Sequence, residues 1–361
     1  MKKQYFLFII PFYIIAVFYV ASTTPISPHE ASTFYHSHSI VSTFMHWGES
    51  LVDGFLGLRI FFILFGITSI FLYYKVSQRY FTKPSEVYLS TVLFMLLPGV
   101  LTATTLANEA VIVLSLVLYF VLMYEREKFW TLPFVMLALF FVHEASIIFF
   151  IALLFYGLAY HDKKLLIASS AFLAAFIYLA KGIEIGGGPS GHFVEIFGLY
   201  ASVFSPLLFL YFFYSLYRIL LREKKTLIWY ISFTALAFSL LLSIRQRIHI
   251  ADFAPYVTLS IILMLDVFNR TLLVRLPEFQ KSYKQAFYGV IFSLVVSFFI
   301  IVFHQMLFVV LSNPSEHFAY RIYKPYFLAK ELHSQELECY DGAHGKEVYQ
   351  LRYYDIPPCT K

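Results

Sequence analysis

Apolar residues of this chain fall into long runs that are separated by short polar and charged segments. A helix needs about 20 mostly apolar residues to cross the ~30 Å hydrocarbon core of a bilayer, and many runs approach that length. The pattern therefore predicts an all-α polytopic membrane protein with about eleven transmembrane helices. The expected spans lie near residues 5–22, 57–74, 86–104, 109–124, 130–142, 146–160, 165–180, 199–217, 226–244, 254–268 and 286–311.

The run from Trp130 to Tyr160 decides how the spans are counted. One long helix would place a basic segment outside, whereas two short helices turning at His143 and Glu144 keep both ends inside. Basic residues concentrate in cytoplasmic loops, so we expect the hairpin. The clusters that mark the inner side are Lys2-Lys3, Lys75 with Arg79 and Lys83, Arg126 with Lys128, Lys163-Lys164, Arg218 with Arg222, Lys224 and Lys225, and Arg270 with Arg275, Lys281 and Lys284.

This charge pattern also predicts location and domain organisation. We expect an integral protein of the cytoplasmic (inner) membrane with a cytoplasmic amino terminus. Residues 1–311 would form the multispanning domain, and residues 312–361 a small extracytoplasmic tail. Lys2-Lys3 and the apolar run after them resemble a signal peptide, but no small-x-small cleavage site is clear before Thr23-Thr24-Pro25, so we expect an uncleaved first span.

Composition supports the membrane assignment and excludes one class of partner. Hydrophobic residues make up 60% of the chain and charged residues only 14%, against about 25% in soluble proteins. Aromatic residues reach 20%, in keeping with rings at the membrane–water interface. The net charge of +5 is scattered, without the basic stripe that nucleic acid needs. Composition does not separate a transporter, an enzyme and a scaffold.

The two cysteines, Cys339 and Cys359, both lie in the tail, and the membrane part has none. A cysteine pair in an exported segment predicts a disulfide. The alternative is two unpaired thiols in a cytosolic tail.

The first outer loop, from Thr23 to about Leu56, opens with the features of a helix start. Ser27 fits the N-cap, Pro28 the first helical position and Glu30 the acidic partner of a capping box. Apolar residues at helical spacing then predict one amphipathic helix in the outer interface. A capping-box glutamate needs no catalytic role, so this pattern leaves Glu30 between a structural and a functional role. The spaced positions are Ala31, Phe34, Tyr35, His38, Val41 and Met45.

Ionisable residues also gather at the other outer hairpin tips, and of the 12 histidines only His161 lies in an expected inner loop. Ionisable side chains at membrane depth are costly and usually face a cavity or each other. Arg245 and Arg247 break the positive-inside pattern, which favours a lipid or substrate phosphate as their partner. The alternative is contact with ordinary phospholipid head groups. The tip residues are Glu109, His143, Glu144, Arg245, Arg247, His249 and Asp252.

His36 and His38 could supply half of a metal site. Residues i and i+2 of a helix point to different faces, which argues against a shared ion. No other ligand set is compelling, so we assign no metal and leave a divalent cation open. The Gly186–Gly191 run lacks the Lys-Ser/Thr of a phosphate-binding loop and predicts a hinge or lid at most.

Two segments near the amino end carry a recognisable pattern. They are Pro25-Ile26-Ser27-Pro28-His29-Glu30-Ala31 with Tyr35, and Gly57-Leu58-Arg59-Ile60-Phe61-Phe62-Ile63-Leu64-Phe65-Gly66. Together they resemble the GT-C glycosyltransferases of the protein-mannosyltransferase and aminoarabinose-transferase type. Asn108-Glu109 takes the place of a second outer-loop acid, and Arg247-Ile248-His249 with Tyr256 resembles a late Arg-Tyr segment. The resemblance covers residues 1 to about 160. His29 stands where the family usually has aspartate, and the tail replaces the family's larger periplasmic domain.

The resemblance implies transfer of a sugar from a polyprenyl-phosphate donor to a lipid, glycan or protein acceptor at the outer face, with inversion. A base must activate the acceptor, and the resemblance implies Glu30 for that role. Glu109 is the second expected catalytic acid. Positioned cations would stabilise the departing phosphate. The expected substrate-binding residues are His29, Arg59, His143, Glu144, Arg245, Arg247 and His249.

Two alternatives stay open. Phe141-Val142-His143-Glu144-Ala145-Ser146-Ile147 is similar to a segment of exopolysaccharide polymerases, which join preassembled lipid-linked repeats. A transporter or flippase of lipid-linked glycans is the non-enzyme alternative. It predicts internal repeats or charges at mid-membrane depth. The sequence shows no convincing repeat, and its polar residues gather at one face, which favours an enzyme.

Overall fold

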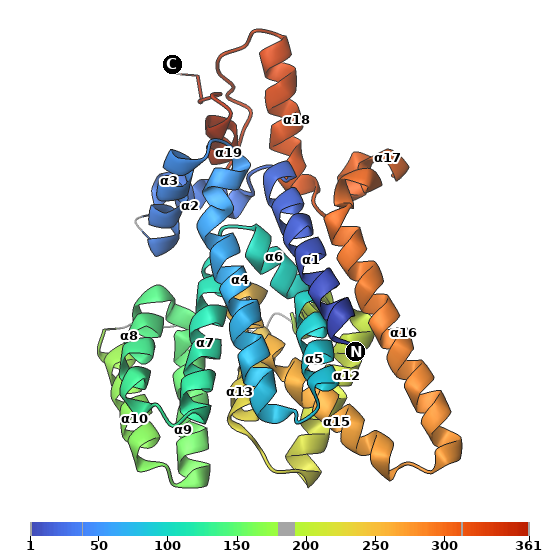
Figure 1. Ribbon diagram of the computed structural model, residues 1–361. Coiled ribbons are helices and arrows are strands. Elements are labelled where there is room, and N and C mark those ends of the chain that lie inside the picture. The colour runs from blue at the N-terminus through green and yellow to red at the C-terminus, as the bar shows by residue number, and fades with distance from the viewer. Residues whose placement is uncertain (1, 38, 180–191, 312, 360–361) are drawn as a thin grey trace. The chain divides into compact units, whose positions relative to one another are not determined.

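The computed structural model describes residues 2–37, 39–179, 192–311 and 313–359, and all regular structure in these ranges is helical (Figure 1). The expected all-α architecture is confirmed. The α-helices are α1 (Lys3–Thr23), α2 (Pro28–His36), α3 (Ile40–Leu51), α4 (Phe55–Tyr80), α5 (Pro84–Met95), α6 (Pro98–Thr105), α7 (Glu109–Glu125), α8 (Leu132–Val142), α9 (Ile147–Tyr160), α10 (Lys163–Tyr178), α11 (Phe193–Phe204), α12 (Pro206–Arg222), α13 (Leu227–Ser243), α14 (Ala254–Val257), α15 (Ile261–Val274), α16 (Pro277–Val302), α17 (Leu307–Val310), α18 (Tyr320–Ser334) and α19 (Glu347–Tyr353). Short 3-10 turns are η1 (Phe129–Thr131), η2 (Glu144–Ser146), η3 (Ile250–Asp252), η4 (Thr258–Ser260), η5 (His304–Met306) and η6 (Pro314–Glu316).

Within the described ranges, four helices are long and apolar enough to cross a membrane, or up to six if each bent pair forms one span. The four are Lys3–Thr23, Phe55–Tyr80, Ala254–Val274 and Pro277–Val302. The remaining apolar runs form shorter helices, such as the 11-residue α8, which is only about 16 Å long. Membrane-spanning helices are therefore present, and the count of eleven stays a prediction.

Proline divides two of the expected spans. The span near 86–104 consists of α5 and α6, bent by 61°, and the span near 199–217 of α11 and α12, bent by 106°. Pro98 and Pro206 each open the second helix, a position where the missing N–H costs nothing. Between α11 and α12, Ser205 adopts a φ of +81°, which is uncommon for a residue other than glycine.

The run from Trp130 to Tyr160 also breaks where the sequence predicts. Helix α8 ends at Val142, His143 is extended, and η2 and α9 follow. Helices α8 and α9 both contact α10 (Figure 1). The break holds the imidazole of His143 at a chain turn, outside any helix.

The single amphipathic helix expected in the first outer loop is wrong in one respect, because two helices form there. Helix α2 ends at His36, Ser37 is extended, and α3 starts after Ser39. The hydroxyl of Ser37 accepts a hydrogen bond from Ser39 N at 3.1 Å, and the hydroxyl of Ser39 caps Ser42 N at 3.2 Å. Serine side chains thus take over backbone bonds that would continue the helix. The apolar residues Ala31, Phe34, Val41 and Met45 are buried inside the protein.

The chain divides into two compact units. Unit 1 comprises Met1–Pro11, Phe65–Thr102 and Glu109–Phe298, and unit 2 comprises Phe12–Leu64, Ala103–Asn108 and Phe299–Lys361. The tail thus belongs to the same unit as the first outer loop. The division at about residue 311 that the sequence predicts stays a prediction.

Unit 1 is a helical bundle with an aromatic core. Helix α9 packs on α10 and α13, and α7 packs on α8 and α14. Phe120 and Phe149 are fully buried, with ring centroids 5.0 Å apart in an edge-to-face contact. Such contacts stabilise a core beyond the area they bury.

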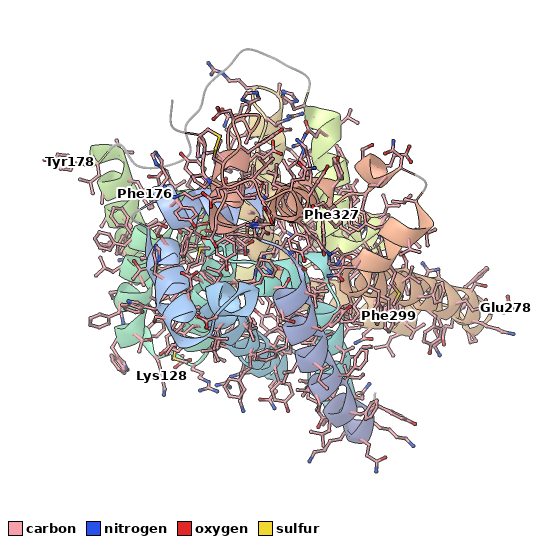
Figure 2. All side chains as sticks on the ribbon, turned by 90° about the horizontal axis from the view of Figure 1, so that it is seen from above. Lys128, Phe176, Tyr178, Glu278, Phe299 and Phe327 are labelled. Atoms are coloured by element: carbon pink, nitrogen blue, oxygen red, sulfur yellow. A yellow bond between two sulfur atoms is a disulfide. The ribbon has the colours of Figure 1, made fainter. Side chains whose placement is uncertain are left out.

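In unit 2 the tail packs on the first outer loop. Helix α2 contacts α3 and α19, and α18 contacts α19. The buried amide of Gln350 donates a hydrogen bond to Ile26 O at 2.8 Å. Cys339 and Cys359, for which the sequence predicts a disulfide, are joined by one, the yellow bond in Figure 2. The tail therefore holds the loop that carries Glu30.

Candidate functional site

Glu30 of unit 2 begins as the capping residue that the sequence predicts. Ser27 N donates to Glu30 Oε2 at 2.8 Å, and Glu30 N donates to Ser27 Oγ at 3.2 Å, which completes a capping box at the start of α2. The structural role of Glu30 is thus present in the folded chain. Its further contacts give it a second role.

Arg59, near the start of α4, forms a two-pronged ion pair with Glu30. Arg59 Nε donates to Glu30 Oε1 at 2.8 Å, and Arg59 Nη2 donates to Oε2 at 2.8 Å. Ala107 N donates to Oε1 as well, at 2.7 Å. The side chains of Arg59 and Glu30 are 0% and 1% exposed. Each carboxylate oxygen therefore accepts two hydrogen bonds, which fills its acceptor positions.

The remaining donors of Arg59 bind backbone carbonyls at the end of α1 and in the turn after it. Nη1 donates to Ala21 O at 2.9 Å and to Thr24 O at 2.7 Å, and Nη2 donates to Pro25 O at 2.9 Å. A guanidinium has five N–H donors, and all five are used here. Arg59 was expected to bind substrate, but in this state its donors join α1, α2 and α4 to one another.

These contacts set the charge of Glu30. Burial by itself raises the pKa of a carboxyl group, but the charge and hydrogen bonds of Arg59 and the N–H groups of Ala107 and Ser27 outweigh it, so the pKa of Glu30 lies below its usual value. Glu30 is therefore ionised at neutral pH and a weak base. His29 beside it is exposed, with Nδ1 at 3.4 Å from Thr33 Oγ1.

A second cluster of ionisable residues lies in unit 1. His143 Nε2 lies 3.2 Å from Asp252 Oδ1, which joins the break after α8 to the end of η3. Glu109, the first residue of α7, and Glu144 act on His143 through their charges. Burial by itself lowers the pKa of His143. The hydrogen bond to Asp252 and the charges of the three nearby carboxylates outweigh burial, so the pKa of His143 lies above its usual value. The site thus favours an imidazolium.

Two buried hydroxyls belong to the same part of unit 1. Tyr256 and Ser146 are 0% exposed, and their hydroxyls are close enough to influence one another. Asp252 also acts on Tyr256 through its charge. Among the described residues neither hydroxyl has a partner that meets full hydrogen-bond geometry. Such buried hydroxyls can bond a water or a hydroxyl of a ligand.

The loop after α13 carries three of the expected substrate-binding residues at the surface of unit 1. Arg245, Arg247 and His249 are exposed. Arg247 Nε lies 3.1 Å from Glu195 Oε1, and Glu195 Oε2 lies 3.1 Å from His192 Nδ1. The side chain of Arg247 is 73% exposed, so its guanidinium can still meet a phosphate.

The structure brings the expected residues together in two sets. Glu30, Arg59 and His29 belong to unit 2, and in unit 1 Glu109, Glu144 and Asp252 all act on His143. Asp252 was expected among the outer tip residues but without a role, and Ser146, Glu195 and Gln350 were not expected as site residues. Asp252, Glu195 and Gln350 meet their partners through distant segments, which no local spacing identifies. Ser146 lies only three residues after His143, so its place in the sequence could have identified it.

No group of three or more His, Cys, Asp or Glu side chains in the described ranges could hold a metal ion. His38 and Gly186–Gly191 lie outside the described residues. We therefore assign no metal ion, and a divalent cation stays open as the sequence analysis left it.

Comparison with known proteins gives evidence at the level of the fold. No protein-family model matches the chain, and no curated protein does. Among solved structures, the crystal structure of ArnT from Cupriavidus metallidurans in the apo state matches with a TM-score of 0.61 at 13% sequence identity. The match covers 99% of this chain and 85% of the ArnT chain. The protein therefore has an ArnT-like fold over nearly its whole length.

Proposed function

We propose that the protein is an integral-membrane glycosyltransferase of the GT-C type. It would move a sugar from a polyprenyl-phosphate donor to an acceptor at the outer face of the cytoplasmic membrane. The observation that carries this proposal is the ArnT-like fold along 99% of the chain. The resemblance of the first outer loop and of the start of the second span to GT-C enzymes supports it independently of the fold.

The general base in this proposal is Glu109. A base must offer a lone pair to the proton of the acceptor. The carboxylate of Glu30 is buried and accepts four hydrogen bonds, from Arg59, Ala107 and Ser27. Glu109 is partly exposed, so an acceptor can approach it, and it acts on His143 through its charge. We therefore assign Glu30 and Arg59 as positioning residues and move the base from Glu30, where the family resemblance puts it.

The bond changes follow from this assignment. Glu109 takes the proton of the acceptor hydroxyl while that oxygen attacks the anomeric carbon of the sugar. The bond from the anomeric carbon to the phosphate oxygen breaks, and the phosphate leaves with the electron pair. Attack from the face opposite the phosphate inverts the anomeric centre.

Cations of unit 1 would stabilise the departing phosphate. Arg245 and Arg247 are exposed on one loop with His249, and the raised pKa of His143 favours a further positive charge. Charge that builds up on the leaving group is stabilised more in the transition state than in the ground state, which is the condition for catalysis. Glu144 would bind sugar hydroxyls.

The test is turnover by the purified full-length protein in lipid nanodiscs, given a panel of polyprenyl-phosphate sugars and scored by donor consumption. Glu109→Gln should lower kcat by at least about 100-fold, the range of general-base catalysis. The exposed Glu127→Gln is the matched control and should leave kcat unchanged. If Glu30→Gln folds normally and loses kcat while Glu109→Gln does not, the base is Glu30.

Other outcomes would contradict the function itself. Use of preassembled lipid-linked repeats alone would identify a polymerase. Movement of lipid-linked glycan across the bilayer without cleavage of the sugar–phosphate bond would identify a flippase.

A further inference from the structure

Unit 1 contains a cavity of about 230 Å³ that none of the proposed catalytic residues lines. It lies among the end of α7, η1 and the first turns of α8 and α10. The apolar part of its wall consists of Tyr124, Phe129, Leu132, Met136, Leu165 and Ala168, with Pro133.

An apolar cavity of this size is suited to hydrocarbon. A cavity of about 150 Å³ lined by aliphatic and aromatic side chains stays dry and binds benzene. The cavity here is larger, and it belongs to a protein with membrane-spanning helices. A methylene chain is the abundant apolar ligand in that surrounding.

A lysine stands in the cavity wall. The ammonium of Lys164 lies 5.3 Å from the ring centroid of Phe129, which is itself a lining residue. The Lys164 side chain is exposed, so its charge is accessible to a ligand. It would meet an anionic group at one end of a bound chain.

Asp162 is the other charged residue of the wall, and its oxygens are already hydrogen-bonded within the protein. Oδ1 accepts from the backbone N–H groups of Lys164 and Leu165 at 3.1 and 3.2 Å, and Oδ2 accepts from the Tyr124 hydroxyl at 3.0 Å. Asp162 acts here as the N-cap of α10. Its carboxylate is therefore committed to the fold and does not neutralise a ligand cation.

The chain segments next to the cavity are suited to a membrane surface. Lys128, at the margin of the ribbon in Figure 2, and Lys163 are exposed beside the lining residues Phe129 and Lys164. Trp130 is 73% exposed, as is usual for indole rings at the bilayer interface. Acids occur there too, since Glu127 is exposed and Glu125 accepts a hydrogen bond from the Tyr80 hydroxyl at 3.2 Å.

We propose that this cavity is a binding site for an anionic phospholipid. One acyl chain occupies the apolar cavity, and Lys164 binds the phosphate, with Lys128 and Lys163 adding positive charge at the rim. Basic pockets at the cytoplasmic ends of membrane helices bind anionic head groups in this way. The site goes beyond the proposed sugar transfer and does not depend on it.

The test is native mass spectrometry of delipidated full-length protein, titrated with phosphatidylglycerol or phosphatidylcholine in mixed micelles. We expect one phosphatidylglycerol to bind at least fivefold more tightly than phosphatidylcholine. Lys164→Gln should reduce that preference, and Lys281→Gln, an exposed lysine of another basic segment, should not.

A second pair of variants tests the cavity itself. Ala168→Phe places a ring in the cavity and should lower the affinity for phosphatidylglycerol at least fivefold, whereas Ala174→Phe on an exposed position of α10 should not. Thermal unfolding in detergent shows whether each variant is folded. Equal binding of both lipids, preferential binding of polyprenyl phosphate, or unchanged binding by Lys164→Gln would overturn the proposal, even if Ala168→Phe fails to fold.

Discussion

At the scale of single residues, the pair of Glu30 and Arg59 shows how a site residue can serve the fold. The carboxylate and the guanidinium are buried with all acceptor and donor positions used. Burying two charges is costly, and this geometry offsets the cost only while both partners are present. The pair therefore makes α1, α2 and α4 depend on one another.

Removing one partner of this pair should destabilise the protein strongly. Arg59→Met leaves the charge of Glu30 buried and unpaired, which costs about 3–5 kcal/mol of unfolding free energy. Thermal unfolding in detergent measures the loss. Arg247→Met removes the exposed pair with Glu195 and should cost less than about 1 kcal/mol. Equal losses in the two variants would contradict the role of Arg59.

The lowered pKa of Glu30 gives this stability a pH dependence. The contribution is present above the unfolded pKa of about 4.3 and is lost as pH falls through the lower folded value. The difference in unfolding free energy between the wild type and Arg59→Met should therefore shrink to a small fraction of its neutral-pH value in strong acid.

Asp252 should control the protonation of His143. Its hydrogen bond and charge help to raise the pKa of His143, so Asp252→Asn should lower that pKa and move the corresponding limb of the pH profile of kcat/KM to lower pH. The raised pKa stabilises the fold below the unfolded value of about 6.5, and this gain is lost as pH rises through the folded value. Asp266→Asn, whose partner is Arg270, is the control. If the pH profile of kcat/KM is the same in Asp252→Asn as in the wild type, Asp252 does not control the protonation of His143.

At the scale of elements, the position of Arg59 depends on the elbow between α3 and α4, which is the sharp turn at residues 52–54 between the two helices. The two helices approach so closely that a Cβ on Gly48 would lie 2.1 Å from Gly57 O, and a Cβ on Gly57 would lie 1.7 Å from Val52 O. Both obstacles are backbone atoms, which cannot rotate away. The third residue of α4 must therefore be glycine for Arg59, two residues later, to reach Glu30.

Gly57→Ala should disrupt this elbow. The added methyl group forces the backbone apart, and we expect a loss of about 1–3 kcal/mol in unfolding free energy, as for other overpacked sites. Gly198→Ala is the matched control, because in the described part of the chain nothing beyond its own stretch of helix lies within 4 Å of an added Cβ, and alanine favours a helix. Thermal unfolding of both variants measures the effect. A stable Gly57→Ala protein would show that the elbow can relax.

At the scale of the whole molecule, the two cysteines allow a direct test of orientation. In a Cys339→Ser, Cys359→Ser background the chain has no other cysteine. A membrane-impermeant maleimide should label Ser334→Cys in intact cells and Lys3→Cys only after permeabilisation, because the amino end is expected inside and the tail outside. Labelling of both after lysis is the control. The reverse pattern would contradict the positive-inside assignment.

Much of this architecture could be predicted because it is local. Apolar runs gave a helical membrane protein, and Ser27, Pro28 and Glu30 gave a capping box, since a cap depends on residues three positions apart. The break at His143 followed from the distribution of basic residues. The two helices of the first loop were missed, because hydrophobic spacing does not register the competing serine hydroxyls at Ser37 and Ser39.

The sequence by itself therefore determined which segments are helical and apolar and where ionisable residues collect along the chain. Only the tertiary structure decided the partners of those residues. Glu30 and Arg59 are 29 positions apart and His143 and Asp252 109 apart, so their pairing depends on helix packing and not on spacing. Burial and partner charge then set the protonation of Glu30 and His143, and both exist only once the chain has folded.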